Sequence, residues 1–120
     1  MLTDSLKTLL ATSYAFVIKV QNFHWNVEGS NFPQYHTFFD DLQGEVYDNA
    51  IDRTAEYIRT LEAYTPGSIT RYAELSLIPD QLKIPKAHLM FAELYRDNEI
   101  IIEHLNECYD ISEAAKQYGI

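Results

Sequence analysis

Two histidines and two carboxylates, residue types that bind iron, stand at helical spacings in the first half of the chain. His24 and His36 lie twelve residues apart, on either side of Gly29. Sixteen residues after His36 come Asp52 and Glu56, which are one helical turn apart and can point the same way. Imidazole and carboxylate ligands together suit iron, zinc or manganese. We therefore expect these four side chains to form a metal site between helices, with coordination positions left open for oxygen or peroxide.

Each of these residues also has an ordinary structural interpretation. A histidine at a helix end can be a hydrogen-bonded packing residue, and the two carboxylates can belong to a solvated helix face with arginines nearby. The Glu-x-x-His pair of many di-iron bundles is absent, which argues against an ordinary ferritin or a di-iron oxygenase with its site inside one subunit. The residues three positions before the four histidines are Gln21, Pro33, Pro85 and Ile101.

Helical periodicity positions the histidines at one corner of a bundle. Apolar residues recur at helical spacing up to Val27, with Thr3, Asp4 or Ser5 as the expected cap and Gly29 as the expected end. A second segment starts near 31–33, with proline in its first turn, and stops before 65–67. Its expected apolar stripe is Tyr35, Phe39, Leu42, Val46, Ala50, Thr54, Ile58 and Leu61.

The second half of the chain predicts one short and one long helix. A connecting helix is expected from Ser68, its cap, to about Ile78, and a third long helix from Pro85 to a point before Gly119. The expected core face of this long helix is Leu89, Met90, Leu94, Ile101, Leu105 and Cys108. The fold class is therefore all-α, a bundle with three long helices and one short connecting helix, which should leave an apolar groove.

Composition restricts the classes of function. The 120 residues, with a net charge of −9, fit one domain over 1–120 and argue against a general nucleic-acid binder. No apolar run is long enough to span a membrane, and the N-terminus lacks the basic region of a signal peptide. The single cysteine, Cys108, is expected to be a buried apolar residue in a reducing cytoplasm. Trp25 is expected to anchor the core or an interface.

The sequence resembles the Dps (DNA protection during starvation) family of mini-ferritins, in particular its bacterial and phage members. The resemblance rests on His-Trp-Asn-Val-x-Gly-x-Asn-Phe from His24, a histidine twelve residues later, and Asp-x-x-Ala-Glu from Asp52, and it runs from about residue 5 to the end. It implies a ferritin-like four-helix bundle that assembles into a hollow, usually dodecameric shell. It also implies a ferroxidase that oxidises Fe(II), preferably with hydrogen peroxide, and stores ferric mineral.

The same resemblance distributes the site residues over a two-fold interface. His24, His36 and Asp40 would come from one subunit, Asp52 and Glu56 from its partner, and Trp25 would lie close to the iron. Iron is the expected metal, with zinc or manganese as possible surrogates. The expected partner is a second copy of the chain.

One extra residue separates this chain from the pattern of the family. The aspartates that match Asp40 and Asp52 are usually eleven residues apart, whereas here they are twelve apart. Eleven steps of about 100° return to within about 20° of the same helix face, whereas twelve overshoot to about 120°. Without correction, Ile51 and Ala55 would take the carboxylate positions. We therefore predict a π-bulge between Asp41 and Ile51, near Gly44, that absorbs the extra residue.

Two further departures define the alternatives to a ferroxidase. The basic N-terminal tail with which many Dps proteins bind DNA is missing, since only Lys7 is basic among the first eighteen residues. This argues against a DNA-condensing protein. The last bundle helix of the family has no counterpart in the sequence, so the fold is expected with that helix missing or truncated. The main alternative is a non-catalytic ferritin-like assembly protein whose metal site is degenerate.

Overall fold

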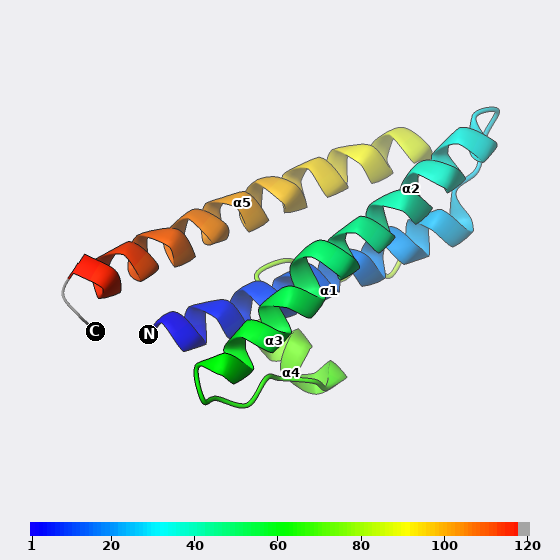
Figure 1. The fold of residues 1–120 in the computed structure, drawn as a ribbon. Coiled ribbons are helices and arrows are strands. Elements are labelled where there is room, and N and C mark those ends of the chain that lie inside the picture. Colours follow the sequence, from blue (N-terminus) through cyan, green and yellow to red (C-terminus); the bar gives the residue numbers. More distant parts are fainter. Residues whose placement is uncertain (118–120) are drawn as a thin grey trace.

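The computed structural model describes residues 1–117 and shows an all-helical chain without strands in that range. Its three long rods run side by side, α1 and α5 antiparallel and α2 continued by η1 and α3 (Figure 1). The expected all-α, ferritin-like fold class is confirmed. The elements are α1 (Leu2–Asn26), α2 (Phe32–Val46), η1 (Tyr47–Ile51), α3 (Asp52–Thr60), α4 (Ile69–Leu75) and α5 (Ala87–Gln117).

Both ends of α1 differ from the sequence expectation. The cap is Met1 rather than Thr3, Asp4 or Ser5, and it makes no side-chain cap hydrogen bond. The helix ends at Asn26, before the expected Gly29, because Val27 adopts extended backbone angles. Gly29 lies in the turn that follows, with a φ of +113° that favours glycine.

The predicted π-bulge is confirmed and forms η1. It covers Tyr47–Ile51, inside the predicted interval but after Gly44. Helices α2, η1 and α3 continue as one rod, because the residues that join them keep right-handed helical backbone angles. The rod ends at Thr60, somewhat earlier than expected, and Glu62 follows with a φ of 63°.

The π turn changes which side chains of the rod face the core. Val46 packs partly buried against the core and the next fully buried residue is Ile51, five positions later, which is the spacing of a π turn. Ala50 and Thr54, which regular periodicity assigned to the stripe, are only half-buried. Asp52 consequently lies on the exposed side of the rod.

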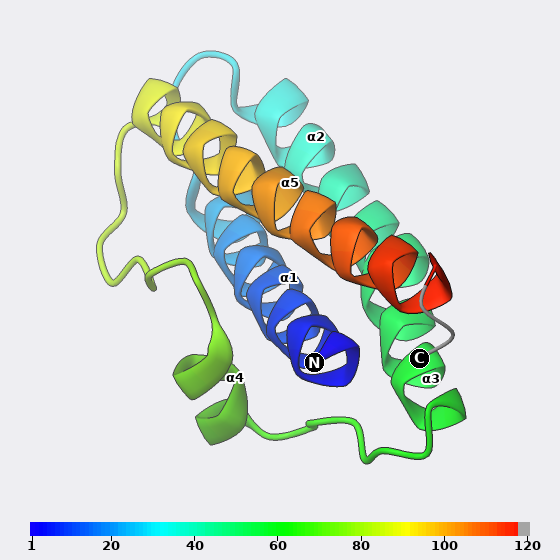
Figure 2. The same ribbon diagram turned by 90° about the vertical axis from the view of Figure 1, so that its left-hand side faces the viewer.

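Helix α4 lies outside the three rods and packs on α1, as Figure 2 shows. The predicted cap is confirmed, because the Ser68 hydroxyl accepts a hydrogen bond from Arg71 N at 3.3 Å. The helix ends at Leu75, earlier than Ile78, and the chain then crosses back to the start of α5. Thr12 Oγ1 of α1 accepts from Leu77 N at 3.0 Å and so fastens this crossover segment to the bundle.

Helix α5 begins at Ala87 rather than Pro85, and only half of its expected core face is buried. Met90, Leu94 and Cys108 are buried, as predicted, and Ile101 is half-buried. Leu89 and Leu105 are about half exposed, so their assignment to the core is wrong for the single chain. The expected apolar groove corresponds to a pocket of about 390 Å³ lined by Leu2, Leu6, Leu9, Tyr57, Leu105, Asn106, Cys108, Tyr109 and Ser112.

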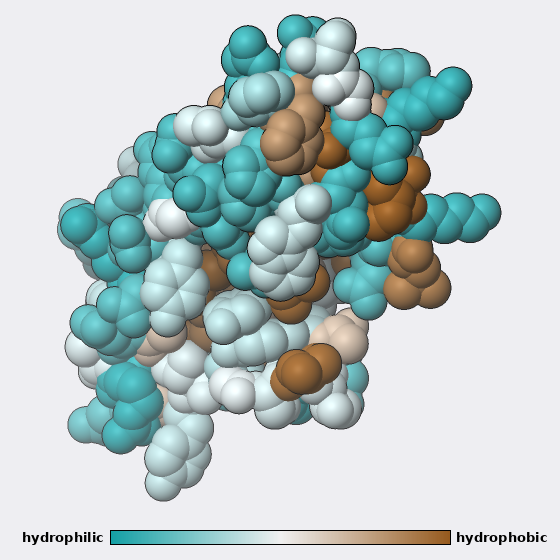
Figure 3. Space-filling model, turned by 90° about the vertical axis from the view of Figure 1, so that its right-hand side faces the viewer, coloured by the Kyte–Doolittle hydropathy of each residue, from teal (hydrophilic) through white to brown (hydrophobic). Residues whose placement is uncertain are grey.

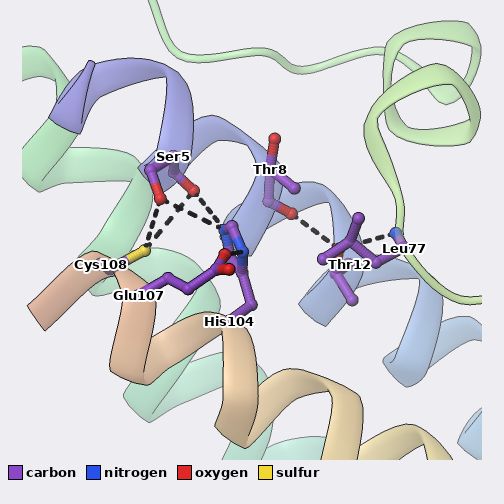
Figure 4. Close-up of polar contacts among 7 residues, drawn as sticks. All are labelled: Ser5, Thr8, Thr12, Leu77, His104, Glu107 and Cys108. Carbon is purple, nitrogen blue, oxygen red and sulfur yellow. Dashed lines mark hydrogen bonds and ion pairs between the residues drawn. The ribbon is translucent and has the colours of Figure 1, made fainter. Parts of the chain in front are cut away.

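Polar contacts fix α5 against α1 at two levels. Near the N-terminus, His104 Nε2 contacts the Ser5 carbonyl oxygen at 2.8 Å and Nδ1 contacts Glu107 Oε2 at 3.2 Å, while Cys108 Sγ lies 3.1 Å from the Ser5 hydroxyl (Figure 4). Further along, the buried ammonium group of Lys19 contacts Asp97 at 2.7 Å and Glu93 at 3.0 Å. The contacts to Ser5 and those of Lys19 link α5 to α1.

Candidate metal centre

The two histidines predicted from the sequence meet at the corner between α1 and α2. Their rings stack with centroids 3.9 Å apart and planes inclined by 17°. His24 Nδ1 donates to the His36 carbonyl oxygen at 2.7 Å, and His36 Nδ1 donates to the His24 carbonyl oxygen at 2.7 Å. The helix ends position these side chains, since α1 terminates two residues after His24 and α2 starts four residues before His36.

The reciprocal hydrogen bonds determine which nitrogen of each ring can bind a metal. A carbonyl oxygen can only accept, so each Nδ1 must carry the proton. In the neutral imidazole, Nε2 then keeps its lone pair and is available as a ligand atom. Metal-binding histidines commonly donate the other ring N–H to a carbonyl or carboxylate in this way.

Asp40, the third residue predicted from the same copy, lies beside His24. Its Oδ1 lies 3.9 Å from His24 Nε2, and the carboxylate is 60% exposed. Metal bonds to histidine nitrogen and carboxylate oxygen are about 2.0–2.2 Å long in zinc sites, so these two atoms can both bind one ion. Gln43 Nε2 donates to Asp40 Oδ1 at 3.0 Å and steadies the carboxylate from the next helical turn.

Asp52 and Glu56 do not join these three residues within one chain. Both are exposed on α3, and twelve residues of helix place Asp52 about 18 Å along the rod from Asp40. In residues 1–117, no three side chains of the types His, Cys, Asp and Glu gather as a metal cluster. Within one chain, Asp52 and Glu56 are therefore separate from the pair of histidines.

Trp25 is not a core residue of the single chain, since 65% of it is exposed. The expectation that Trp25 anchors the core is therefore wrong for the single chain, and its expected roles at an interface and close to the iron stay predictions. At the end of the molecule that carries the turn between α1 and α2, apolar side chains interrupt a mainly hydrophilic surface (Figure 3). Phe32 and Phe38, 40% and 49% exposed, are among the apolar residues that α2 leaves open to solvent.

Sequence reasoning missed two features of the site. Phe32 stacks on His36 with ring centroids 5.1 Å apart, a contact indicated only by its spacing of four residues. Gln43 was likewise overlooked, although it stands three residues after Asp40.

No helix in the described part of the chain is long and apolar enough to cross a membrane.

Comparison with known proteins places the chain in a family. The model of the ferritin-like domain matches residues 3–120. A low temperature-induced protein of Nostoc is 33% identical over 104 residues, which are 86% of this chain and 58% of the relative. The DNA protection during starvation protein 2 of Bacillus anthracis is 28% identical over 95 residues, 79% of this chain and 64% of the relative. The chain thus spans less than two thirds of the length of these curated relatives.

Solved structures agree with this placement. The crystal structure of Dps from Staphylococcus aureus superposes with a TM-score of 0.90 at 29% identity, over 96% of this chain and 76% of that one. The chain belongs to the ferritin-like family. Within that family its fold is that of the Dps proteins, so the resemblance inferred from the histidine and aspartate motifs is confirmed.

Proposed function

We propose that the protein is a Dps-like mini-ferritin that binds Fe(II) between two copies of the chain and oxidises it. His24, His36 and Asp40 of one copy and Asp52 and Glu56 of the other form the proposed site, with Trp25 beside it. The observation that carries the proposal is the reciprocal hydrogen bonding of the stacked histidines, which leaves both Nε2 atoms free as ligands.

Iron is the substrate of this reaction, and the donor set suits both of its oxidation states. Neutral imidazoles bind Fe(II), while the three carboxylates add negative charge that favours Fe(III). Hydrogen peroxide accepts a pair of electrons, its O–O bond breaks, and two protons are taken up as water forms. A pair of Fe(II) ions is therefore oxidised for each peroxide. Oxygen is the alternative oxidant, and storage of the Fe(III) inside an assembled shell is the proposed outcome.

Anaerobic iron loading followed by peroxide tests this function. The parent should bind Fe(II) saturably and oxidise it rapidly, and His24→Ala and Asp52→Ala should each slow the oxidation by at least about tenfold, as expected for loss of a metal ligand. His88→Ala, which changes an exposed histidine outside the site, is the matched control. Oxidation by both site variants at the parental rate would refute the assignment.

The alternative is a non-catalytic ferritin-like assembly protein whose metal site is degenerate, and the extra residue between Asp40 and Asp52 suggests it. A zinc titration separates the two functions. Saturable binding that disappears in His24→Ala supports the iron site, whereas no saturable binding to the parent supports the assembly protein.

A further inference from the structure

Phe32, His36 and His24 form a stack of three rings at the corner between α1 and α2. His36 is the middle ring, 3.9 Å from His24 at 17° and 5.1 Å from Phe32 at 24°. Both neighbours are nearly parallel to His36, so its imidazole stacks against two other rings.

Phe32 is the first residue of α2 and makes this contact although 40% of it is exposed. The torsion that turns an imidazole about its Cβ–Cγ bond has broad energy minima, so the rotamer alone does not fix the ring plane. One hydrogen bond, from Nδ1 to the His24 carbonyl oxygen, holds an edge of the His36 ring. Stacking on Phe32 restricts the rotation that this single bond still permits.

We propose that Phe32 is a positioning residue, which holds His36 in the Nδ1-protonated orientation that presents Nε2 to the metal. The inference rests on the proposed iron site but concerns a residue that does not touch the metal. Without the Phe32 ring, the His36 imidazole can turn about its Cβ–Cγ bond, which breaks the Nδ1 hydrogen bond and moves Nε2 away from the metal. Metal binding must then offset the cost of reordering the ring.

Phe38 offers a matched control on the same helix. It is 49% exposed and packs on Phe39 and Phe91, with ring centroids 5.9 and 5.7 Å away. Phe32→Leu and Phe38→Leu thus remove the same ring from similar exposure, and only the first touches a histidine. Phe32→Tyr keeps the ring and serves as the conservative replacement.

Two measurements test the proposal. In zinc titrations, Phe32→Leu should weaken binding by about tenfold, the lower end of the effect of losing a supporting contact, whereas Phe32→Tyr and Phe38→Leu should bind like the parent. In nitrogen NMR of the metal-free protein, His36 should be a single Nδ1–H tautomer in the parent and a mixture in Phe32→Leu. The NMR measurement needs no metal, and the tyrosine variant keeps it informative if the leucine variant folds poorly.

The possible failures are distinguishable. If Phe32→Leu leaves both the zinc affinity and the His36 tautomer unchanged, the positioning role is refuted even though the iron site stands. If the parent shows no saturable zinc binding, the proposed iron site fails, and the positioning role toward a metal fails with it. A change of tautomer in Phe32→Leu would then show only a packing contact.

Discussion

Lys19 carries a positive charge into the interior between α1 and α5. Its side chain is 2% exposed and pairs with Asp97, 3% exposed, and with Glu93, 18% exposed. Gln81 of the crossover segment donates to Glu93 Oε1 at 2.7 Å, so the network also ties this segment to α5. The ammonium group neutralises the buried carboxylate of Asp97 and the nearby carboxylate of Glu93.

Replacing Lys19 by methionine should therefore destabilise the fold strongly. Removing one partner of a buried ion pair costs about 3–5 kcal/mol, because the other charge stays buried and unpaired. Urea unfolding of Lys19→Met measures the loss, and Lys116→Met, at an exposed position of α5, is the control. Equal stability of the two variants would show that the network contributes nothing to the fold.

The histidines predict how metal binding depends on pH. Only the neutral imidazole binds a metal, so protons compete with the ion for His24 and His36. Zinc affinity should therefore fall as the pH is lowered. Titrations at several pH values test this, with His88→Gln as a control whose profile should match that of the parent. An affinity independent of pH from about 5 to 7 would argue against histidine ligands.

At the level of residues, the sequence predicted that His24 and His36 converge but did not predict the groups that surround them. The spacing of His24 and His36 was enough to bring the two rings together at one corner. The backbone carbonyls that receive their protons could not be predicted, because they depend on where α1 ends and α2 begins, within one or two residues. Lys19 was missed because a single lysine on an apolar stripe gives no sign of partners 74 and 78 residues away.

Element η1 absorbs the one extra residue between Asp40 and Asp52. The π turn puts Ile51 into the core and leaves Asp52 exposed. Deletion of Asn49, an exposed residue inside η1, should convert η1 to regular α-helix while Ile51 stays buried and Asp52 stays exposed. The variant should still bind zinc. Insertion of one alanine after Asn49 should instead turn α3 by about 100° and bury carboxylates.

Thermal unfolding and zinc titration of the deletion and insertion variants measure these effects. The free energy of unfolding of the deletion variant should remain within about 1 kcal/mol of the parental value. The insertion variant should lose stability and zinc binding, as expected when charges enter a core. If the deletion variant loses zinc binding while the insertion variant keeps it, the π turn does not set the register of the site.

Helix α4 is held on α1 by a tyrosine pair. Tyr72 stacks on Tyr14 with ring centroids 4.6 Å apart, and its hydroxyl donates to the Pro66 carbonyl oxygen at 3.0 Å. Burial raises the pKa of Tyr72, with smaller contributions from Tyr14 and Tyr47. The neutral phenol is thus favoured in the folded state.

The raised pKa of Tyr72 predicts a loss of stability at alkaline pH. Tyrosine in the unfolded chain ionises near about pH 10. The contribution of Tyr72 to the free energy of unfolding is fully present below that pH and is lost as the pH rises through the folded-state pKa. Urea unfolding should show a smaller alkaline loss in Tyr72→Phe than in the parent or in Tyr95→Phe, a change at an exposed tyrosine. The same loss in all three proteins would contradict this role.

Element types were more predictable than element ends. Periodicity predicted the three rods and α4. The spacing of twelve residues between Asp40 and Asp52, one more than is usual in the Dps family, predicted the π turn. Its position after Gly44 could not be predicted, because it depends on contacts from other elements: Tyr47 packs edge-on against Tyr14, and Ile51 enters the core beside α1. The cap of α1 was mispredicted for a related reason, since packing of an apolar face stabilises a helix that lacks a capping side chain.

At the scale of the whole molecule, the single chain leaves much apolar surface open. Trp25, Leu105 and Tyr109 are each more than half exposed, and the pocket of about 390 Å³ lies beside the last two. Exposed aromatic side chains of this size are typical of surfaces that bind other protein chains. The sequence indicated that a groove exists, but which residues of α5 line it depends on how the rods pack.

Complementation between inactive variants tests most directly whether the iron site is shared by two copies. His24→Ala and Asp52→Ala subunits, each inactive alone, would be co-expressed and purified together. A mixed two-fold pair contains one intact site, with the histidines from one copy and the carboxylates from the other. Random pairing should then restore about a quarter of the parental rate of iron oxidation by peroxide. A mixture as inactive as its two components, despite confirmed mixed assemblies, would contradict a site shared between subunits.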